Sequence, residues 1–242
     1  MLTALVVAQL AASCLVAESS QLVVVVTEGW TASSGELFTF HRAAGTSPWQ
    51  SDLARVPVFI GKKGLGVGKG ALRLALSGPQ KQEGDARSPA GVFRLGAAFG
   101  TQIKDLKTVL PQDPTTWVCV DDPQSKHYNE RLLAPSVIVD WKHEEQLASY
   151  QRAVVIHHND ERTPGAGSCV FLHDGIGSTP GCSAGASWLI DTLIQWLRPT
   201  ECPILVQLPR KDYAALGKSR SWPALPARQQ LEQTGQCPNT IY

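Results

Sequence analysis

The chain has 242 residues, of which 43% are hydrophobic and 18% are charged, and its formal net charge is +1. This length suits one all-β or mixed domain, or at most two small ones, and the apolar content can form a core without metals or disulfides. The charge balance and the absence of a long basic run give no reason to expect nucleic acid as a partner.

The N-terminus, MLTALVVAQLAASCLVAESS, is apolar from Leu2 to Val16 apart from three polar residues. This stretch is too short for a membrane span and is typical of a signal-peptide core. We therefore expect residues 1–17 to be a signal peptide, with the protein exported to the periplasm or cell envelope and no stable membrane span. Two alternatives are open: a lipid-attachment motif that ends at Cys14, and a first buried strand or helix.

Runs of β-branched or alternating apolar residues, separated by Gly, Ser and Pro turns, predict strands. Between the early and late runs, GKKGLGVGKG (Gly61–Gly70) lacks the Gly-Lys-[Ser/Thr] ending of a phosphate loop and predicts turns between strands. The predicted strands are Leu22–Thr27, Glu36–Arg42, Arg55–Gly61, Trp117–Asp121, Ser136–Trp141, Ala153–His158, Cys169–His173 and Pro203–Leu208.

The segment Ala186–Arg198 has apolar residues at a 3.6-residue spacing, which predicts a helix that ends at Pro199. No internal repeat is apparent, and no linker is long enough to separate domains. The expected fold is therefore one domain over residues 18–226, mainly β with a packed helix (α+β). A C-terminal tail follows over residues 227–242.

The stretch CVFLHDGIGSTPGC, from Cys169 to Cys182, holds more reactive side chains than any other part of the chain. A thiol is a good nucleophile only as the thiolate, and a helix N-terminus or a neighbouring histidine lowers its pKa. Cys182 precedes the predicted helix and His173 ends the adjoining strand, so we predict a nucleophile and its base. Gly181 lets backbone N–H groups point at an oxyanion. The alternative for Cys182 is a buried apolar side chain or half of a disulfide, and the alternative for His173 is a structural histidine.

A zinc site is a second interpretation of the same region, because zinc accepts nitrogen, sulfur and oxygen ligands. No Cys-x₂-Cys pair or His-Glu-x-x-His motif is present, and two adjacent histidines in a strand point to opposite faces. We therefore expect no metal and no cofactor. The residues that this interpretation would use are His157, His158, Asp160, Cys169, His173 and Cys182.

These motifs resemble the L,D-transpeptidase catalytic domain of the YkuD type. That family carries a histidine at the end of a strand, a loop and then [Ser/Thr]-x-Gly-Cys; here these are His173 and Thr179-Pro180-Gly181-Cys182. Its [Thr/Ser]-Pro-x-Gly-x-Phe motif matches SPAGVF (Ser88–Phe93), preceded by Gly84-Asp85. One branch is also similar in VCVDDPQSKHYN (Val118–Asn129), GKKGLGVGKG and GSCVFLH. The whole resemblance runs from about Gln21 to Pro226, which is most of the chain.

The resemblance implies a β-sandwich-like catalytic domain over residues 18–226 that transfers acyl groups on peptidoglycan stem peptides. The thiolate of Cys182 attacks the carbonyl between the third stem residue, a diamino acid, and a terminal D-alanine, and a thioester forms. An amine of a second stem, or water, then releases the acyl group. In this scheme His173 is the general base, the N–H groups of Gly181 and Cys182 line the oxyanion hole, and Thr179, His158 and Asn159 are candidates for substrate binding.

Two departures from the family concern details of the site. Many members have Arg or Asn shortly after the cysteine, where this chain has Ser183-Ala184-Gly185, and the loop between His173 and Cys182 is shorter than in the commonest branch. The leading hypothesis is a transpeptidase that forms 3→3 cross-links or attaches an amine acceptor. The alternatives are a cysteine hydrolase, acting as an L,D-carboxypeptidase or amidase, and a non-catalytic wall-binding protein, although binding alone needs no thiol.

Without Cys14, five cysteines remain, which in an exported protein indicates two disulfides and one free thiol. A nucleophile cannot be bridged, so Cys182 is expected to be free. A Cys202–Cys237 disulfide would anchor the tail. Cys119 and Cys169 then remain, each inside a strand-like run, and they are expected to pair or to be buried free thiols.

Overall fold

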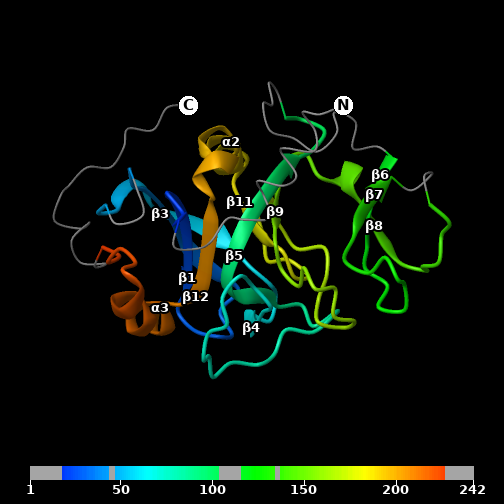
Figure 1. Cartoon of the computed structure of the whole chain (residues 1–242), viewed down its shortest axis with the longest axis horizontal. Helices are drawn as coiled ribbons and strands as arrows, with labels where there is room; N and C mark the ends of the chain where they lie inside the picture. The colour runs from blue at the N-terminus through cyan, green and yellow to red at the C-terminus, as the bar shows by residue number, and fades with distance from the viewer. Residues whose placement is uncertain (1–17, 44–46, 104–115, 134–136, 227–242) are drawn as a thin grey trace.

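The computed structural model describes residues 18–43, 47–103, 116–133 and 137–226 (Figure 1). The expected signal peptide over residues 1–17 and the tail over residues 227–242 lie outside these described residues, as do Cys14 and Cys237. Within the described ranges, no helix has the length and apolar character needed to cross a membrane.

Most strands of the described residues form one sheet that closes on itself like a barrel. The order around it is β12-β1-β2-β3-β11-β10-β9-β5, and β5 pairs back with β12. A short strand, β4 (Leu65–Val67), adds to β5 in parallel. The other strands are β1 (Gln21–Thr27), β2 (Ser34–His41), β3 (Gln50–Phe59), β5 (Ser88–Phe99), β9 (Ala153–Ile156), β10 (Phe171–Asp174), β11 (Ser183–Gly185) and β12 (Ile204–Pro209).

Closure depends on β12, which is parallel to β1 on one side and antiparallel to β5 on the other. Every residue of β1 is buried, which explains its continuous apolar run in place of an alternating one. Phe38, Phe93 and Leu205 of the neighbouring strands are fully buried in the same core cluster. The interior is therefore a packed apolar core.

Two α-helices lie in the described residues, α2 (Ser187–Trp196) and α3 (Arg210–Gly217). The apolar stripe of α2 joins the main core, and Figure 1 shows this helix at one end of the barrel strands. α3 contributes the buried Tyr213 to the same core. The short 3₁₀ helices are η4 (Leu147–Ser149), η5 (Pro199–Glu201) and η6 (Lys218–Arg220).

A separate three-stranded sheet stands beside the barrel (Figure 1) and has the order β7-β6-β8. Its strands are β6 (Trp117–Val120), β7 (Arg131–Leu133) and β8 (Glu144–Gln146), and all of them come between β5 and β9 in the chain. The Cys119–Cys169 disulfide links β6 to the segment before β10, with a Cα–Cα distance of 5.8 Å. We call this sheet, together with η4 and Tyr150, the cover.

The structure confirms that the fold is mainly β, and it contains the predicted helix as α2. It also confirms the Cys119–Cys169 pairing. The predicted strand Ser136–Trp141 is wrong, because residues 137–141 contain no strand and Ile138 is 85% exposed. Cys202 is disulfide-bonded, while its expected partner Cys237 lies outside the described residues.

Candidate active site

Cys182 lies at the end of the loop between β10 and β11, directly before the first residue of β11. The two strands are parallel, and Leu172 is opposite Ser183. Ser183 points into the barrel, where its hydroxyl donates to Oε1 of Gln207 at 2.8 Å. Because successive side chains of a strand alternate between faces, Cys182 lies on the outer face of the sheet.

The Cys182 thiol is covered in this position, with 6% of the residue exposed. Its Sγ accepts a hydrogen bond from the Phe171 N–H at 3.3 Å and donates to the Cys169 carbonyl oxygen at 3.5 Å. It belongs to a small apolar cluster that also contains Leu147 of the cover and both cysteines of the Cys119–Cys169 disulfide. Cys182 is the free cysteine of the described residues, as predicted.

His173 lies in β10 opposite Ala184. Ala184 is two residues after Cys182 in the chain. The strand alternation therefore places the His173 and Cys182 side chains on the same outer face. The imidazole packs edge-on against the Tyr150 ring, with the ring centroids 5.2 Å apart. The predicted nucleophile and base thus lie on the same face of the sheet, and the base is in contact with Tyr150 of the cover.

The hydrogen bond of His173 fixes which ring nitrogen can act as a base. Nδ1 lies 2.8 Å from the Asp174 carbonyl oxygen. A carbonyl oxygen can only accept, so Nδ1 carries the proton and Nε2 keeps its lone pair. Burial lowers the pKa of His173, which keeps the imidazole neutral at pH 7. A neutral imidazole with a free Nε2 is the form that a general base requires.

The Cys182 thiol is neutral as well. Burial raises its pKa to about 12, and the charge of Glu145 acts in the same direction. The prediction that a helix N-terminus lowers this pKa is wrong, because β11 separates Cys182 from α2, which begins only at Ser187. The resting site therefore holds a thiol and an imidazole, not a thiolate–imidazolium pair.

Two residues of the cover, which the sequence motifs did not reveal, complete the surroundings of the thiol. The Tyr150 hydroxyl donates to Oε1 of Glu145, and it lies close enough to Cys182 for each group to influence the pKa of the other. Burial raises the pKa of the Glu145 carboxyl. Tyr150 follows η4 and Glu145 lies in the three-residue strand β8, so neither stands in a run with a recognisable pattern.

Gly181 and Thr179 have positions that differ from their predicted roles. Thr179 is buried, and its hydroxyl donates to the Cys182 carbonyl oxygen at 2.5 Å. The Gly181 N–H donates to Oγ1 of Thr179 at 3.1 Å. In this structure the Gly181 N–H expected in the oxyanion hole is thus already hydrogen-bonded, and Thr179 supports the backbone of the nucleophile.

His158 and Asn159 hold the loop that follows β9. His158 Nε2 lies 3.0 Å from the Ala166 carbonyl oxygen, and Nδ1 accepts from the Lys69 N–H at 3.3 Å. Burial lowers the His158 pKa to about 4. The Asn159 amide donates to the Thr163 and Gly167 carbonyl oxygens, both at 3.0 Å. Both side chains are buried, and these hydrogen bonds join the loop to itself and to Lys69 of the glycine-rich segment.

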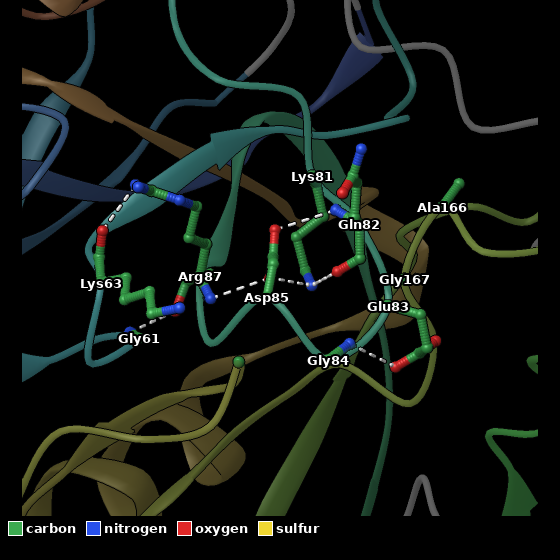
Figure 2. A network of polar contacts seen from close by, with 12 residues as sticks. Gly61, Lys63, Lys81, Gln82, Glu83, Gly84, Asp85, Arg87, Ala166 and Gly167 are labelled. Carbon is green, nitrogen blue, oxygen red and sulfur yellow. Dashed lines mark hydrogen bonds and ion pairs between the residues drawn. The ribbon is translucent and has the colours of Figure 1, made fainter.

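The Gly84-Asp85 motif forms a rigid turn before Ser88 (Figure 2). The Asp85 carboxylate accepts from the Lys81 ammonium at 2.7 Å, from the Gln82 N–H at 2.8 Å and from the Arg87 N–H at 2.9 Å. The Arg87 guanidinium donates to the Lys63 carbonyl oxygen at 2.5 Å and so ties this turn to the segment after β3. The turn fixes the start of β5.

The side chains considered as zinc ligands have other partners in the structure. Cys169 is bonded to Cys119, and His157 pairs with Asp160 at 3.0 Å. No group of three or more His, Cys, Asp or Glu side chains in the described part of the chain is arranged to hold a metal ion.

Surface hollows lie elsewhere on the molecule. One cavity of about 680 Å³ runs along the glycine-rich segment and β5, and another of about 670 Å³ lies between Trp49 and Trp222. Neither is lined by Cys182 or His173. Cys182 itself is 6% exposed, so its thiol is covered in this structure.

Comparisons with known proteins add no identification. A scan against protein-family models, a search of curated proteins and a search of solved structures each found no match. The features that bear on function are the geometry around Cys182 and the sequence motifs that contain it.

Proposed function

We propose that this protein is a cysteine acyltransferase that acts on peptidoglycan stem peptides as an L,D-transpeptidase. The observation that carries the proposal is the placement of Cys182, the free cysteine of the described residues, on the same sheet face as His173. The hydrogen bond from Nδ1 to the Asp174 carbonyl leaves Nε2 of His173 as a base. The motif resemblance supplies the substrate class.

In the proposed reaction Nε2 of His173 takes the Cys182 proton as the sulfur attacks the carbonyl carbon of the third stem residue. The bond from this carbon to the D-alanine nitrogen breaks, the imidazolium returns its proton to that nitrogen, and free D-alanine leaves. The amine of a second stem then attacks the thioester and gives a proton to His173, the bond from carbon to sulfur breaks, and the imidazolium returns the proton to the sulfur to restore the thiol. The products are a 3→3 cross-link and regenerated enzyme.

The neutral resting pair favours proton transfer that accompanies attack over a preformed thiolate. With its pKa raised to about 12, the thiol is protonated at neutral pH and needs the imidazole at the moment of reaction. Entry of a stem peptide would displace Tyr150 and Leu147, which pack beside the thiol. The bound stem peptide would then occupy the space of these side chains and limit the access of water to the thioester, which favours an amine acceptor.

The fold and the disulfides are compatible with this proposal. We propose that the closed sheet, with His173 in β10 and Cys182 directly before β11, is an L,D-transpeptidase-type domain. Disulfides persist in oxidising compartments, so the Cys119–Cys169 bond supports export to the periplasm or cell envelope. The apolar N-terminal sequence agrees with this location.

The test is to incubate the purified protein with peptidoglycan that carries tetrapeptide stems and to identify the products by mass spectrometry. We expect 3→3 cross-linked dimers and free D-alanine. If the products were tripeptides without cross-links, the activity would be hydrolysis by the same residues and not acyl transfer to an amine. Binding without any product would contradict the catalytic proposal.

Two variants accompany this experiment. Cys182→Ser should remove all products, because a serine hydroxyl is a much poorer nucleophile beside a single imidazole. The matched control is Ser168→Ala, which changes one hydroxyl near Cys169 and removes its 2.6 Å bond to Glu83 without touching the thiol. Products formed at the wild-type rate by Cys182→Ser would rule out Cys182 as the nucleophile.

A further inference from the structure

A buried polar network lies behind Cys182, on the opposite side of its peptide from the thiol. The Cys182 carbonyl oxygen accepts two side-chain hydrogen bonds, from Oγ of Ser88 at 2.6 Å and from Oγ1 of Thr179 at 2.5 Å. Ser88 is 0% exposed and Thr179 is 4% exposed. Water therefore does not compete for this carbonyl, and both hydroxyl groups are committed to it.

The direction of each hydroxyl proton follows from its second partner. The Gly61 N–H donates to Oγ of Ser88 at 2.8 Å, and the Gly181 N–H donates to Oγ1 of Thr179 at 3.1 Å. An N–H group can only donate, so each hydroxyl oxygen accepts there and gives its single proton to the Cys182 carbonyl. Two chains of polarised hydrogen bonds converge on one oxygen atom, and each bond strengthens the next.

The two hydroxyls come from segments that are themselves fixed. The backbone of Thr179 bonds on both sides, from its N–H to the Ile60 carbonyl at 3.0 Å and from the Lys62 N–H to its carbonyl at 2.9 Å. Ser88 follows the Asp85 turn of Figure 2. A Cβ atom on Gly61 would lie 2.6 Å from the Ser88 backbone nitrogen, so glycine is needed for this approach.

A third side chain joins the residues that follow Ser88 and Cys182. Gln207 is 0% exposed. Its amide donates to the Pro89 carbonyl at 2.8 Å, and its Oε1 accepts from the Ser183 hydroxyl at 2.8 Å. The peptide that carries the nucleophile is thus attached to β5 and β12 by side chains that have no contact with the outer face.

We propose that Ser88 and Thr179 are positioning residues, which hold the Cys182 carbonyl from behind so that the thiol stays aligned with His173 during acyl transfer. The inference rests on the proposed function for its effect on turnover, although the attachment itself is a property of the folded protein. Neither hydroxyl contacts the thiol or the imidazole. Their contribution is to the geometry of the reacting atoms, to which rates are sensitive.

The kinetic test compares Ser88→Ala and Thr179→Val with the conservative variants Ser88→Thr and Thr179→Ser. Loss of one hydroxyl should lower kcat about 10-fold, with KM within about twofold, because alignment and not binding is lost. The conservative variants should recover most of kcat. Thr39→Val is the matched control, since Thr39 is also buried and its hydroxyl accepts from the Leu53 N–H at 3.0 Å, far from the site in the β2–β3 pair.

A second readout does not depend on turnover. The ¹³Cβ resonance of Cys182 in labelled protein should shift or broaden in Ser88→Ala and Thr179→Val, and it should stay in place in Thr39→Val and Thr179→Ser. Urea unfolding first establishes that each variant is folded. If Thr179→Val does not fold, Ser88→Ala, which removes only one atom, serves as the deciding variant.

The outcomes separate the two proposals. A wild-type protein without turnover on stem peptides contradicts the proposed function, while the resonance still tests the attachment. Equal kcat values for Ser88→Ala and Thr39→Val, or an unchanged Cys182 resonance in Ser88→Ala, would overturn the positioning roles. A conservative variant as impaired as the truncated one would also overturn them, because packing would then explain the loss.

Discussion

The two faces of the β10–β11 pair differ sharply in chemistry. On the inner face Ser183 is bonded to Gln207, and the neutral groups of this buried network are paired with one another. On the outer face the Cys182 and His173 side chains lie under the cover, and burial shifts the pKa of both, upward for the thiol and downward for the imidazole. The inner face therefore carries hydrogen bonds that fix the backbone, and the outer face carries the candidate reactive side chains.

The contrast between the inner and outer faces indicates that the position of Cys182 and its reactivity have separate causes. Its backbone carbonyl is held by hydrogen bonds from the buried Ser88 and Thr179 side chains, which we propose fix its position. Its protonation state depends on the cover, because burial is the largest cause of the raised pKa and Glu145 of β8 is the next. Changes to the outer face should therefore alter pH dependence and access, while the backbone of the nucleophile stays fixed.

The largest effect on the outer face is expected for His173→Ala. General-base catalysis contributes about 10²–10⁴-fold, so the rate at pH 7 should fall by that order. In the wild type the rate should rise with pH through the lowered His173 pKa, below 6.5, and then level off. In the variant only the thiolate reacts, so the rate should keep rising toward the thiol pKa of about 12.

The measurement is kcat/KM against pH. His41→Ala is the matched control, because His41 lies in β2 and pairs with Asp52 at 2.8 Å, outside the site. It should keep the wild-type profile. An unchanged profile in His173→Ala would remove His173 from the mechanism.

The second effect is expected from the disulfide that attaches the cover. Cys119 and Cys169 are separated by 50 residues in the chain, and closing a loop of that length corresponds to about 4 kcal/mol in the chain-entropy model. The double variant Cys119→Ala/Cys169→Ala should lose stability of this order in urea unfolding. Its Cys182 should also react faster with iodoacetamide, because the cover opens more often.

The double variant is preferable to a reducing agent, which would also break the disulfide at Cys202. Side-chain bonds between the cover and the loop before β10 remain in it, such as the Asn129 amide to the His158 carbonyl at 2.9 Å. If Cys182 alkylation stayed at the wild-type rate, these bonds alone would hold the cover closed.

The smallest effect is expected for Tyr150→Phe. The hydroxyl of Tyr150 can donate to the Cys182 sulfur once the thiol has ionised, and it thereby opposes the rise of the thiol pKa. Its removal should raise that pKa further and slow alkylation at pH 10 about fivefold, which corresponds to one hydrogen bond of about 1 kcal/mol. Tyr213→Phe is the control, since its hydroxyl donates to the Pro223 carbonyl at 2.8 Å on α3. Faster alkylation in Tyr150→Phe would contradict this role.

Local patterns in the sequence were sufficient for much of the barrel. The LVVVV run of β1 and the apolar stripe of α2 predict their elements because burial requires those residues. β11 was not predicted, since Ser183-Ala184-Gly185 has no strand pattern and forms only by pairing with β10 and β3. The closure between β12 and β5 joins residues 110 to 116 positions apart in the chain, and periodicity carries no signal of such a pairing.

The candidate site shows the same division. His173 and Cys182 were predicted from their motif, and Cys119–Cys169 from the count of cysteines. Glu145 and Tyr150 were not predicted, because the cover brings them over the thiol through tertiary contacts alone. The prediction that a helix N-terminus lowers the Cys182 pKa was wrong for a local reason, because the short strand β11 lies between Cys182 and α2.

The most direct test of the central claim is to detect the thioester. The protein is mixed with a tetrapeptide stem without an acceptor amine, quenched in acid after a short time and weighed intact by mass spectrometry. We expect an added mass equal to the stem minus D-alanine, located on the Cys182 peptide and absent from Cys182→Ser. A protein that releases D-alanine without this adduct, or carries the adduct on another residue, would contradict Cys182 as the acyl-bearing nucleophile.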